Sequence, residues 1–216
     1  MAGYELHVIS DGKQSWSTMT AIALEIQSYV TAIHIREKTK PMKEILRGLQ
    51  TLLEAGVSPK GIYINGYPSL AIAAKLGGAH LPGSSPPLPA IREIYLGYIR
   101  TGISIHSAEE AWLREQEGAD YLMFGHVFAT ASKQGLPPRG IEQLTEVTGK
   151  VKVPVIAIGG ITPDRVRTVL EAGATGIAVM SGIWEAQDPQ QAAKVYADEM
   201  RRYGGEGRGS IEQKEF

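Results

Sequence analysis

The stretch PVIAIGGITPDRVRTVLEAGATGIAVM, residues 154–180, decides the fold. It opens and closes with apolar, β-branched runs of strand length, and the segment between them has helical spacing. Pro163 stands where the first helical residue is expected, and Gly173 stands where the helix should end. The stretch therefore predicts a strand, a helix and a second strand running the same way, which is the unit of a parallel α/β fold.

Units of the same kind recur along the whole chain. Eight of them share 216 residues, which leaves about 27 residues for each and suits a parallel barrel. A doubly wound open sheet is the rival fold, but it rarely has eight strictly alternating units, and no G-x-G-x-x-G fingerprint follows the first strand. The sequence therefore predicts a single-domain (β/α)8 TIM barrel. The predicted strands span residues 6–10, 31–36, 61–65, 79–81, 102–105, 120–124, 154–158 and 176–180, and the predicted helices begin near Ser17, Pro41, Tyr67, Pro86, Ala108, Gly140, Pro163 and Asp188.

Composition narrows the cellular context and the partners. The formal net charge is -1, so we expect neither nucleic acid nor an anionic membrane as a partner. The chain has no cysteine, which excludes disulfides and Cys-ligated zinc and is typical of a reducing compartment. Polar and acidic residues come too early in the chain for the apolar core of a signal peptide. No apolar run approaches the roughly 20 residues of a membrane span. We expect a cytoplasmic barrel over residues 1–203 and a frayed C-terminal tail over 204–216.

Small residues follow the last two predicted strands. In a barrel of this type, the active site lies at the carboxyl ends of the strands, and phosphate is often held by the loops after strands seven and eight. Gly159 and Gly160 follow the seventh strand, and Ser181 and Gly182 follow the eighth. Backbone N–H groups in such turns, close to a helix start, favour an anion. We expect these residues to bind phosphate; the alternative is that the glycines serve tight turns alone.

Two cations are predicted near the same end of the barrel. Strand alternation sends Arg36 into the top of the barrel, where a guanidinium needs a carboxylate or phosphate partner. The alternative for Arg36 is an internal ion pair with Glu37 or Asp11. Lys133 lies in the segment TASKQG, which is typical of a loop that closes over a ligand. The alternative for Lys133 is a solvated loop cation.

All five histidines lie in or just after predicted strands. The carboxylate spacing that usually completes a metal site is missing around them, so we expect no bound metal. His7, His34 and His80 lie mid-strand or beside small residues, which predicts hydrogen-bonded filling of the barrel interior. His106 and His126 lie at strand ends on the catalytic rim, where an imidazole can accept and donate a proton near neutral pH. We expect His126 to be catalytic, and His106 either to share that role or to hold the loop after the fifth strand.

A series of motifs in chain order resembles the thiamin phosphate synthase superfamily. IHIREK at 33–38 is similar to that family's Arg and Lys motif on strand two, and GISIHS at 102–107 is similar to its Gly-x-Ser-x-His-Ser segment. Residues 153–183 match the phosphate-binding end of the family nearly residue for residue. The likeness runs from about Leu6 to Tyr196. It implies a barrel enzyme of thiamin biosynthesis.

Two acidic segments of that superfamily are altered here. Its Asn-Asp segment reads Asn65-Gly66, and its His-Leu-Gly-Gln-Glu-Asp segment reads AHLPGSS, ending in Ser84 and Ser85. The family's aspartates serve the magnesium ion that neutralises the leaving pyrophosphate. The resemblance therefore implies chemistry without a metal or another cofactor. It also places His126 where the family loop has a proline.

These departures, with FGHVF at 124–128, are similar to the thiazole tautomerase branch of the superfamily. That resemblance implies a carboxythiazole phosphate substrate whose ring becomes aromatic when a proton moves from ring carbon 2 to an exocyclic carbon. It implies His126 as the base, Asn65 among the substrate-binding residues, and a homodimer. The alternatives are thiamin phosphate synthase activity, a non-catalytic regulator that binds a thiazole phosphate, and a phosphorylated-sugar epimerase.

Overall fold

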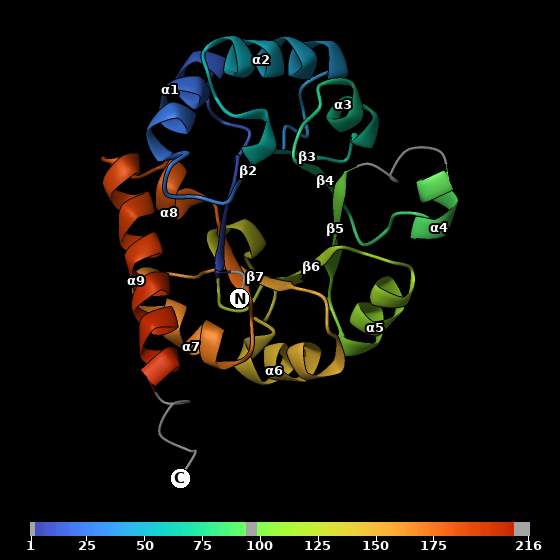
Figure 1. The fold of residues 1–216 in the computed structure, drawn as a ribbon, viewed down its shortest axis with the longest axis vertical. Coiled ribbons are helices and arrows are strands. Elements are labelled where there is room, and N and C mark those ends of the chain that lie inside the picture. Colours follow the sequence, from blue (N-terminus) through green and yellow to red (C-terminus); the bar gives the residue numbers. More distant parts are fainter. Residues whose placement is uncertain (1–2, 94–98, 210–216) are drawn as a thin grey trace.

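The strands form a closed barrel. The computed structural model describes residues 3–93 and 99–209, and within them eight parallel strands pair in chain order, with β8 returning to β1. The helices lie outside this ring (Figure 1). The predicted (β/α)8 barrel is therefore confirmed, and each predicted strand overlaps an observed one. The strands are β1 (Glu5–Ile9), β2 (Ala32–Ile35), β3 (Ile62–Asn65), β4 (Gly78–Leu81), β5 (Arg100–Ile105), β6 (Tyr121–Gly125), β7 (Val155–Ile158) and β8 (Gly176–Val179).

Seven of the eight predicted helices begin within about two residues of their predicted starts, the margin by which helix ends vary. At Pro163 a short 3-10 turn begins, and the α-helix follows from Val166. Gly173 follows α7 with a φ of +89°, as expected of a residue that ends a helix. Among the described residues, no helix is long and apolar enough to cross a membrane. The α-helices are α1 (Trp16–Ile26), α2 (Met42–Glu54), α3 (Pro68–Ala73), α4 (Leu88–Ile91), α5 (Ala108–Gln116), α6 (Gly140–Lys150), α7 (Val166–Glu171), α8 (Ser181–Trp184) and α9 (Pro189–Gly209); short 3-10 turns are η1 (Pro59–Gly61), η3 (Ala131–Lys133) and η4 (Pro163–Arg165).

Two helical features differ from the expectation. The short helix α8 follows β8 directly, before the long α9 that the sequence pattern indicates. Helix α9 continues to Gly209, so the first part of the expected frayed tail, from Gly204, is helical, while residues 210–216 lie outside the described residues. Near this end Tyr203 packs against Tyr4, with ring centroids 5.6 Å apart. This contact ties the end of α9 to the start of the chain.

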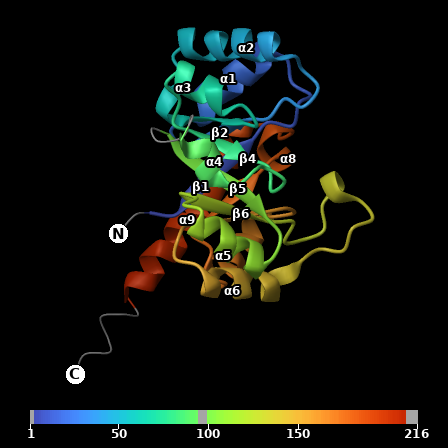
Figure 2. The same cartoon turned by 90° about the vertical axis from the view of Figure 1, so that its right-hand side faces the viewer.

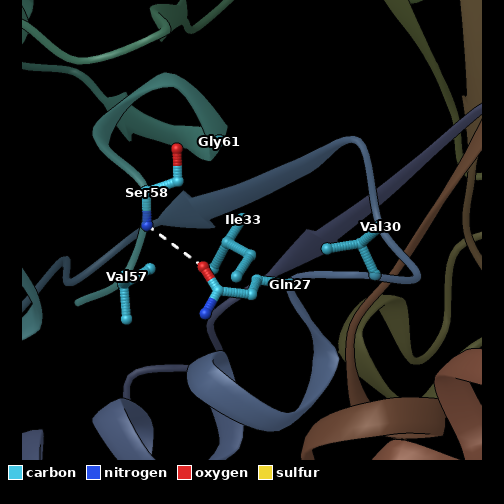
Figure 3. Close-up of a pocket in the computed structure, with 6 residues that line it drawn as sticks. All are labelled: Gln27, Val30, Ile33, Val57, Ser58 and Gly61. Atoms are coloured by element: carbon cyan, nitrogen blue, oxygen red, sulfur yellow. Dashed lines mark hydrogen bonds between the residues drawn. The ribbon is translucent and has the colours of Figure 1, made fainter. Parts of the chain in front are cut away.

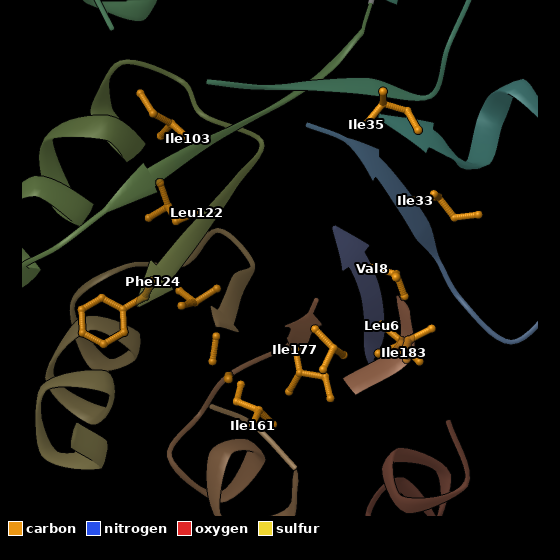
Figure 4. Close-up of a cluster of buried hydrophobic side chains, with 14 of the residues drawn as sticks. Leu6, Val8, Ile33, Ile35, Ile103, Leu122, Phe124, Ile161, Ile177 and Ile183 are labelled. Atoms are coloured by element: carbon orange, nitrogen blue, oxygen red, sulfur yellow. The ribbon is translucent and has the colours of Figure 1, made fainter. Parts of the chain in front are cut away.

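The side chains along each strand point alternately to the two faces of the barrel wall, and this separates two hydrophobic clusters. On β2, Ile33 and Ile35 join the large cluster, part of which is drawn in Figure 4. Their neighbour Ala32 belongs instead to the smaller cluster. The division follows the two-residue period of a strand, because successive side chains point to opposite faces. The smaller cluster lies inside the barrel and comprises Ile9, Ala32, Tyr63, Tyr121, Met123, Ile156 and Ala178.

Two tyrosines fill the barrel interior toward the end where the strands begin. The rings of Tyr63 and Tyr121 have centroids 6.2 Å apart and are nearly perpendicular. Glycines on neighbouring strands leave room for them. A Cβ on Gly78 would lie 2.3 Å from the ring of Tyr63, and a Cβ on Gly102 would lie 1.9 Å from the ring of Tyr121. The interior is therefore packed to a density that excludes a methyl group at either glycine.

Gly102→Ala should lower the free energy of unfolding by about 1 to 3 kcal/mol, because an overpacked interior must shift a ring or the backbone. Urea unfolding measures this change. Gly149→Ala is the matched control: Gly149 is exposed near the end of α6, and its added Cβ would meet nothing within 4 Å. That control should be neutral or stabilising by about 0.5 to 1 kcal/mol. An equal loss of unfolding free energy in both variants would contradict the tight packing around Gly102.

Three histidines are hydrogen-bonded inside the barrel, as predicted. His7 and His34 are fully buried, with Nδ1 of His7 2.9 Å from Nε2 of His34. His80 lies 2.9 Å from the hydroxyl of Ser104 and 3.2 Å from that of Tyr121. Burial lowers the pKa of all three rings, and that of His80 to about 3. They are therefore neutral at pH 7 and serve the packing of the interior.

An ion pair lies at the end of the barrel where the strands begin. The Arg100 guanidinium donates two hydrogen bonds to the Glu5 carboxylate, at 2.6 and 2.8 Å. His7 Nε2 lies 3.0 Å from the same carboxylate. Burial alone would raise the pKa of Glu5, but the bonds from Arg100 and His7 outweigh burial and lower it to about 2. The folded protein therefore favours ionised Glu5.

This lowered pKa predicts a loss of stability in acid. Because the folded pKa of Glu5 lies below its ordinary value of 4.5, its contribution is complete above that value and disappears as the pH falls toward about 2. We expect a loss of about 2 to 3 kcal/mol over this window from Glu5. Urea unfolding at a series of pH values should show a flatter acid limb in Glu5→Gln than in the wild type. Parallel acid limbs would contradict the assignment.

Candidate active site

His126 lies at the mouth of the barrel, the end where the carboxyl ends of the strands meet. It directly follows β6 and is only 9% exposed. Its Nε2 lies 3.3 Å from the carbonyl oxygen of Leu136. A carbonyl only accepts, so Nε2 carries the proton and donates it weakly. The other ring nitrogen, Nδ1, makes no hydrogen bond with any of the described residues and keeps a lone pair.

Gly159 makes room for His126. The pairing of β6 with β7 continues past the strands, because the Val127 N–H donates to the Ile158 carbonyl at 2.9 Å. Gly159 then has a φ of +104°, and a Cβ there would lie 2.4 Å from the Cβ of His126. The glycine is therefore required by the close approach of two loops, independently of any ligand.

His106 holds the end of β5 against the end of β6. Its Nδ1 lies 3.3 Å from the carbonyl oxygen of Gly125. Arg139 donates to that same carbonyl at 3.0 Å and to the His106 carbonyl at 2.8 Å. His106 thus fills the loop-holding role, while its share in proton transfer stays a prediction. Arg139, which sequence reasoning missed, is the residue that links the two strand ends; its sequence context carries no motif that would have identified it.

Arg36 follows β2 and is half-buried. The alternative ion pair with Glu37 does not form, because Glu37 accepts a hydrogen bond from Ser10 at 2.7 Å and pairs with Lys40. Nor does Asp11 pair with Arg36; its nearest ammonium group is that of Lys13. Within residues 3–93 and 99–209, the Arg36 guanidinium makes no ion pair. It is available for an anionic ligand.

Lys38 lies within electrostatic reach of both Arg36 and Lys133. The charge of Arg36 is the first cause that lowers the pKa of Lys38, followed by burial and the charge of Lys133. The charge of Glu37 also acts on Arg36, but Glu37 pairs with Lys40. Like charges gathered around a guanidinium that has no ion pair favour a bound anion. Lys133 lies in η3, on a loop that stands out from the body of the molecule (Figure 2). Lys38 belongs to the Arg and Lys motif of the sequence, but the motif alone did not predict it as a site residue.

The two predicted phosphate-binding turns lie after β7 and β8. A Cβ on Gly160 would lie 2.4 Å from the carbonyl oxygen of Ala129, and a Cβ on Gly182 would lie 2.7 Å from the Tyr196 hydroxyl. Packing alone therefore explains both glycines. Ser181 and Gly182 form the first turn of α8, where N–H groups have no acceptor within the helix. Phosphate binding by these groups stays a prediction.

The ends of β3 and β4 carry no carboxylate. Asn65 ends β3 with its side-chain oxygen 3.0 Å from Nδ1 of His34, and Gly66 follows with a φ of +83°. Ser84 and Ser85 lie in the turn after β4. In the described part of the chain, no three His, Cys, Asp or Glu side chains are grouped to hold a metal ion. This donor set does not fit a magnesium ion bound to pyrophosphate.

A small cavity lies away from the mouth. It has a volume of 130 Å³, and most of its lining residues precede β2 and β3. The Ser58 N–H donates to the Gln27 side chain at 3.1 Å across it (Figure 3). The lining residues are Gln27, Val30, Ile33, Val57, Ser58 and Gly61, none of which titrates. This cavity therefore offers no acid–base chemistry.

The chain is similar to known proteins along most of its length. A family model described as thiamine monophosphate synthase matches residues 6–183. The thiamine-phosphate synthase of Chlorobium luteolum is 32% identical over 88% of this chain and 89% of its own length. That of Archaeoglobus fulgidus is 35% identical over 92% and 94%. The solved structure of thiamine phosphate pyrophosphorylase from Pyrococcus furiosus superposes with a TM-score of 0.77 at 32% identity, covering 93% of this chain and 96% of that one.

Proposed function

Since this chain belongs to the thiamine monophosphate synthase family, we propose that it acts as a thiazole tautomerase in thiamin biosynthesis. The proposed substrate is the product of thiazole synthase, a non-aromatic carboxythiazole that carries an exocyclic double bond and a phosphate arm. The reaction moves one proton and makes the ring aromatic. The observation that carries the proposal is the free Nδ1 of His126 at a mouth whose β3 and β4 ends lack carboxylates.

His126 serves as base and then as acid in this proposal. Its Nδ1 takes the proton from ring carbon 2, and the electrons of that C–H bond form a double bond from carbon 2 to the ring nitrogen. The existing ring double bond shifts, and the exocyclic double bond opens to take the same proton back from the imidazolium. The hydrogen bond from Nε2 to the Leu136 carbonyl supports this role, because it strengthens when the ring becomes positive.

The three cations at the mouth suit the ring carboxylate. Removing a proton from carbon 2 adds negative charge beside that carboxylate, so a guanidinium or ammonium group there lowers the barrier. Arg36 is the first choice and Lys133 the second, with Lys38 within reach of both. The phosphate arm would then extend toward the N–H groups of Gly160 and Ser181 and their neighbours Gly159 and Gly182.

Arg36→Leu should raise KM for the carboxylated substrate by about 10- to 100-fold, because a charge-assisted hydrogen bond is lost in a half-buried place. Lys133→Ala should raise KM by only about threefold, since Lys133 is exposed on an outlying loop. Steady-state kinetics measure both. The aromatic thiazole phosphate that lacks the carboxylate is the control ligand and should bind the wild type and Arg36→Leu equally. Equal weakening of both ligands would show that Arg36 does not bind the carboxylate.

The direct test of the proposed function uses freshly made thiazole synthase product. The pure protein, treated with a chelator, should accelerate growth of the aromatic thiazole absorbance over the rate without protein. The reaction is an internal transfer of one proton, so no pyrophosphate and no second substrate are needed. If the rate at which the absorbance grows is independent of protein concentration, the tautomerase assignment is refuted.

Thiamin phosphate synthase is the second candidate, because relatives 32–36% identical to this chain carry that name. The pyrimidine diphosphate, the thiazole phosphate and magnesium would then yield thiamin phosphate and pyrophosphate. The residues at Gly66, Ser84 and Ser85 argue against it, since none offers a carboxylate to magnesium. Release of pyrophosphate in this assay, without tautomerisation in the other, would reverse the order of the two candidates.

A further inference from the structure

A chain of hydrogen bonds runs inside the barrel from Glu5 to Asn65 at the mouth. His7 Nε2 lies 3.0 Å from the Glu5 carboxylate, His34 Nε2 lies 2.9 Å from His7 Nδ1, and His34 Nδ1 lies 3.0 Å from the Asn65 side-chain amide. Both rings are 0% exposed. Water cannot replace any link, so each contact needs one donor and one acceptor from the chain itself.

Glu5 sets the direction of this chain. Its ionised carboxylate, held by two hydrogen bonds from Arg100, can only accept. His7 must therefore donate through Nε2, which leaves a lone pair on its Nδ1 when the ring is neutral. His34 must then donate through its own Nε2 to that lone pair. The Nδ1 of His34 is left as an acceptor.

The surroundings keep both rings neutral. Burial lowers the pKa of His7, and burial, followed by the neighbouring His7 and His80, lowers the pKa of His34 well below its ordinary value. The rings that pack against His34 are those of His7, Tyr63 and His80, and none of them is a carboxylate. Of the described residues, Glu5 is the only carboxylate bonded to the chain.

An acceptor on His34 cannot face the oxygen of the Asn65 amide at 3.0 Å, since two acceptors repel. A half turn about the Asn65 Cβ–Cγ bond exchanges the two ends of the amide at little steric cost. We propose that the Glu5–His7–His34 chain holds Asn65 with its NH2 group toward His34 and its carbonyl oxygen toward the mouth. The end of the amide away from His34 has no partner among the described residues and is not sealed from solvent, and Asn65 is the last residue of β3, at the end of the barrel where the mouth lies.

Asn65 is thereby a positioning residue that presents an acceptor at the end of β3. An acceptor repels a carboxylate or phosphate, so an anionic ligand turns its carboxylate away from β3 and toward Arg36. The steering of the ring carboxylate rests on the proposed function, whereas the direction of the hydrogen-bond chain does not.

Nuclear magnetic resonance tests the direction without any turnover. In the 15N-labelled wild type at about pH 7.5, long-range proton–nitrogen correlations should show His7 and His34 both neutral and both protonated on Nε2. His7→Gln and His34→Gln assign the signals. A proton on Nδ1 of His34, with or without one on Nε2, would overturn the proposal.

Two substitutions of His34 test the steering. In His34→Gln the side-chain amide can donate to His7 and accept from Asn65, so KM should stay within about twofold of the wild type. In His34→Leu the Asn65 amide is free to rotate, and KM should rise about tenfold while kcat changes less. Thermal unfolding identifies variants that are folded. An unchanged KM in folded His34→Leu would overturn the steering; absence of tautomerisation in the wild type would refute the proposed function and leave the resonance test standing.

Discussion

His126→Gln should lower the tautomerisation rate by about 10²- to 10⁴-fold, the usual contribution of general acid–base catalysis. Glutamine has a similar length and can still donate to the Leu136 carbonyl, but it has no basic nitrogen to take the proton. A single-turnover experiment that follows aromatic absorbance measures the rate, and a titration with the aromatic product measures binding. The rate should fall while binding is retained.

His106→Gln is the matched control for that experiment. His106 lies at the end of the neighbouring strand and contacts the Gly125 carbonyl, so the substitution disturbs the same rim. If His106 only holds its loop, the rate should change far less than in His126→Gln. A fall of the same size in both variants would assign proton transfer to the pair. A full rate in His126→Gln would remove His126 from the chemistry.

Gly159→Ala should lower both the free energy of unfolding and the tautomerisation rate. The added Cβ would lie 2.4 Å from the Cβ and 2.6 Å from the Cα of His126, and a φ of +104° is strained for alanine. Overpacking and backbone strain together should lower the free energy of unfolding by about 2 to 5 kcal/mol. A base displaced by about 1 Å loses roughly 10²-fold in rate. Urea unfolding and the absorbance assay measure the two effects.

Gly149→Ala again serves as the control, because the added methyl group meets nothing within 4 Å. It should leave the tautomerisation rate unchanged. In Gly159→Ala the rate should stay low at temperatures where the variant is fully folded, which separates displacement of His126 from simple unfolding. A variant that is less stable but fully active would show that Gly159 serves only the turn.

Much of the fold is predictable from local pattern. The β-branched composition predicts the strand just before Gly159, and helix-start signals predict the helical segment from Pro163. Both signals act over a few residues. Local glycine content predicts a frayed tail from Gly204, whereas helix α9 continues past it. Tyr203, just before Gly204, packs against Tyr4 near the other end of the chain, a contact that local pattern does not predict.

The candidate site was only partly predictable. His126 and Arg36 could be predicted as site residues because they lie at strand ends, and the carboxyl ends of barrel strands meet at one end of the barrel. Lys38 lies two residues after Arg36 in the same segment, and the charge of Arg36 lowers its pKa. Arg139 has no sequence signal, because its partners are backbone carbonyls at the ends of β5 and β6. Backbone acceptors exist at every residue, so only the folded geometry selects two of them.

The barrel, its eight units and the end at which an active site is expected all follow from the sequence pattern, because strand and helix periodicity are local and parallel strands share one direction. The sequence also determined that Gly66, Ser84 and Ser85 offer no carboxylate at the mouth. The folded structure is needed to see which nitrogen of His126 has no partner among the described residues and why Gly159 must lack a side chain. The first depends on the 3.3 Å contact of His126 with the Leu136 carbonyl and the second on the close approach of Gly159 to His126, and such contacts are set by packing in the folded barrel.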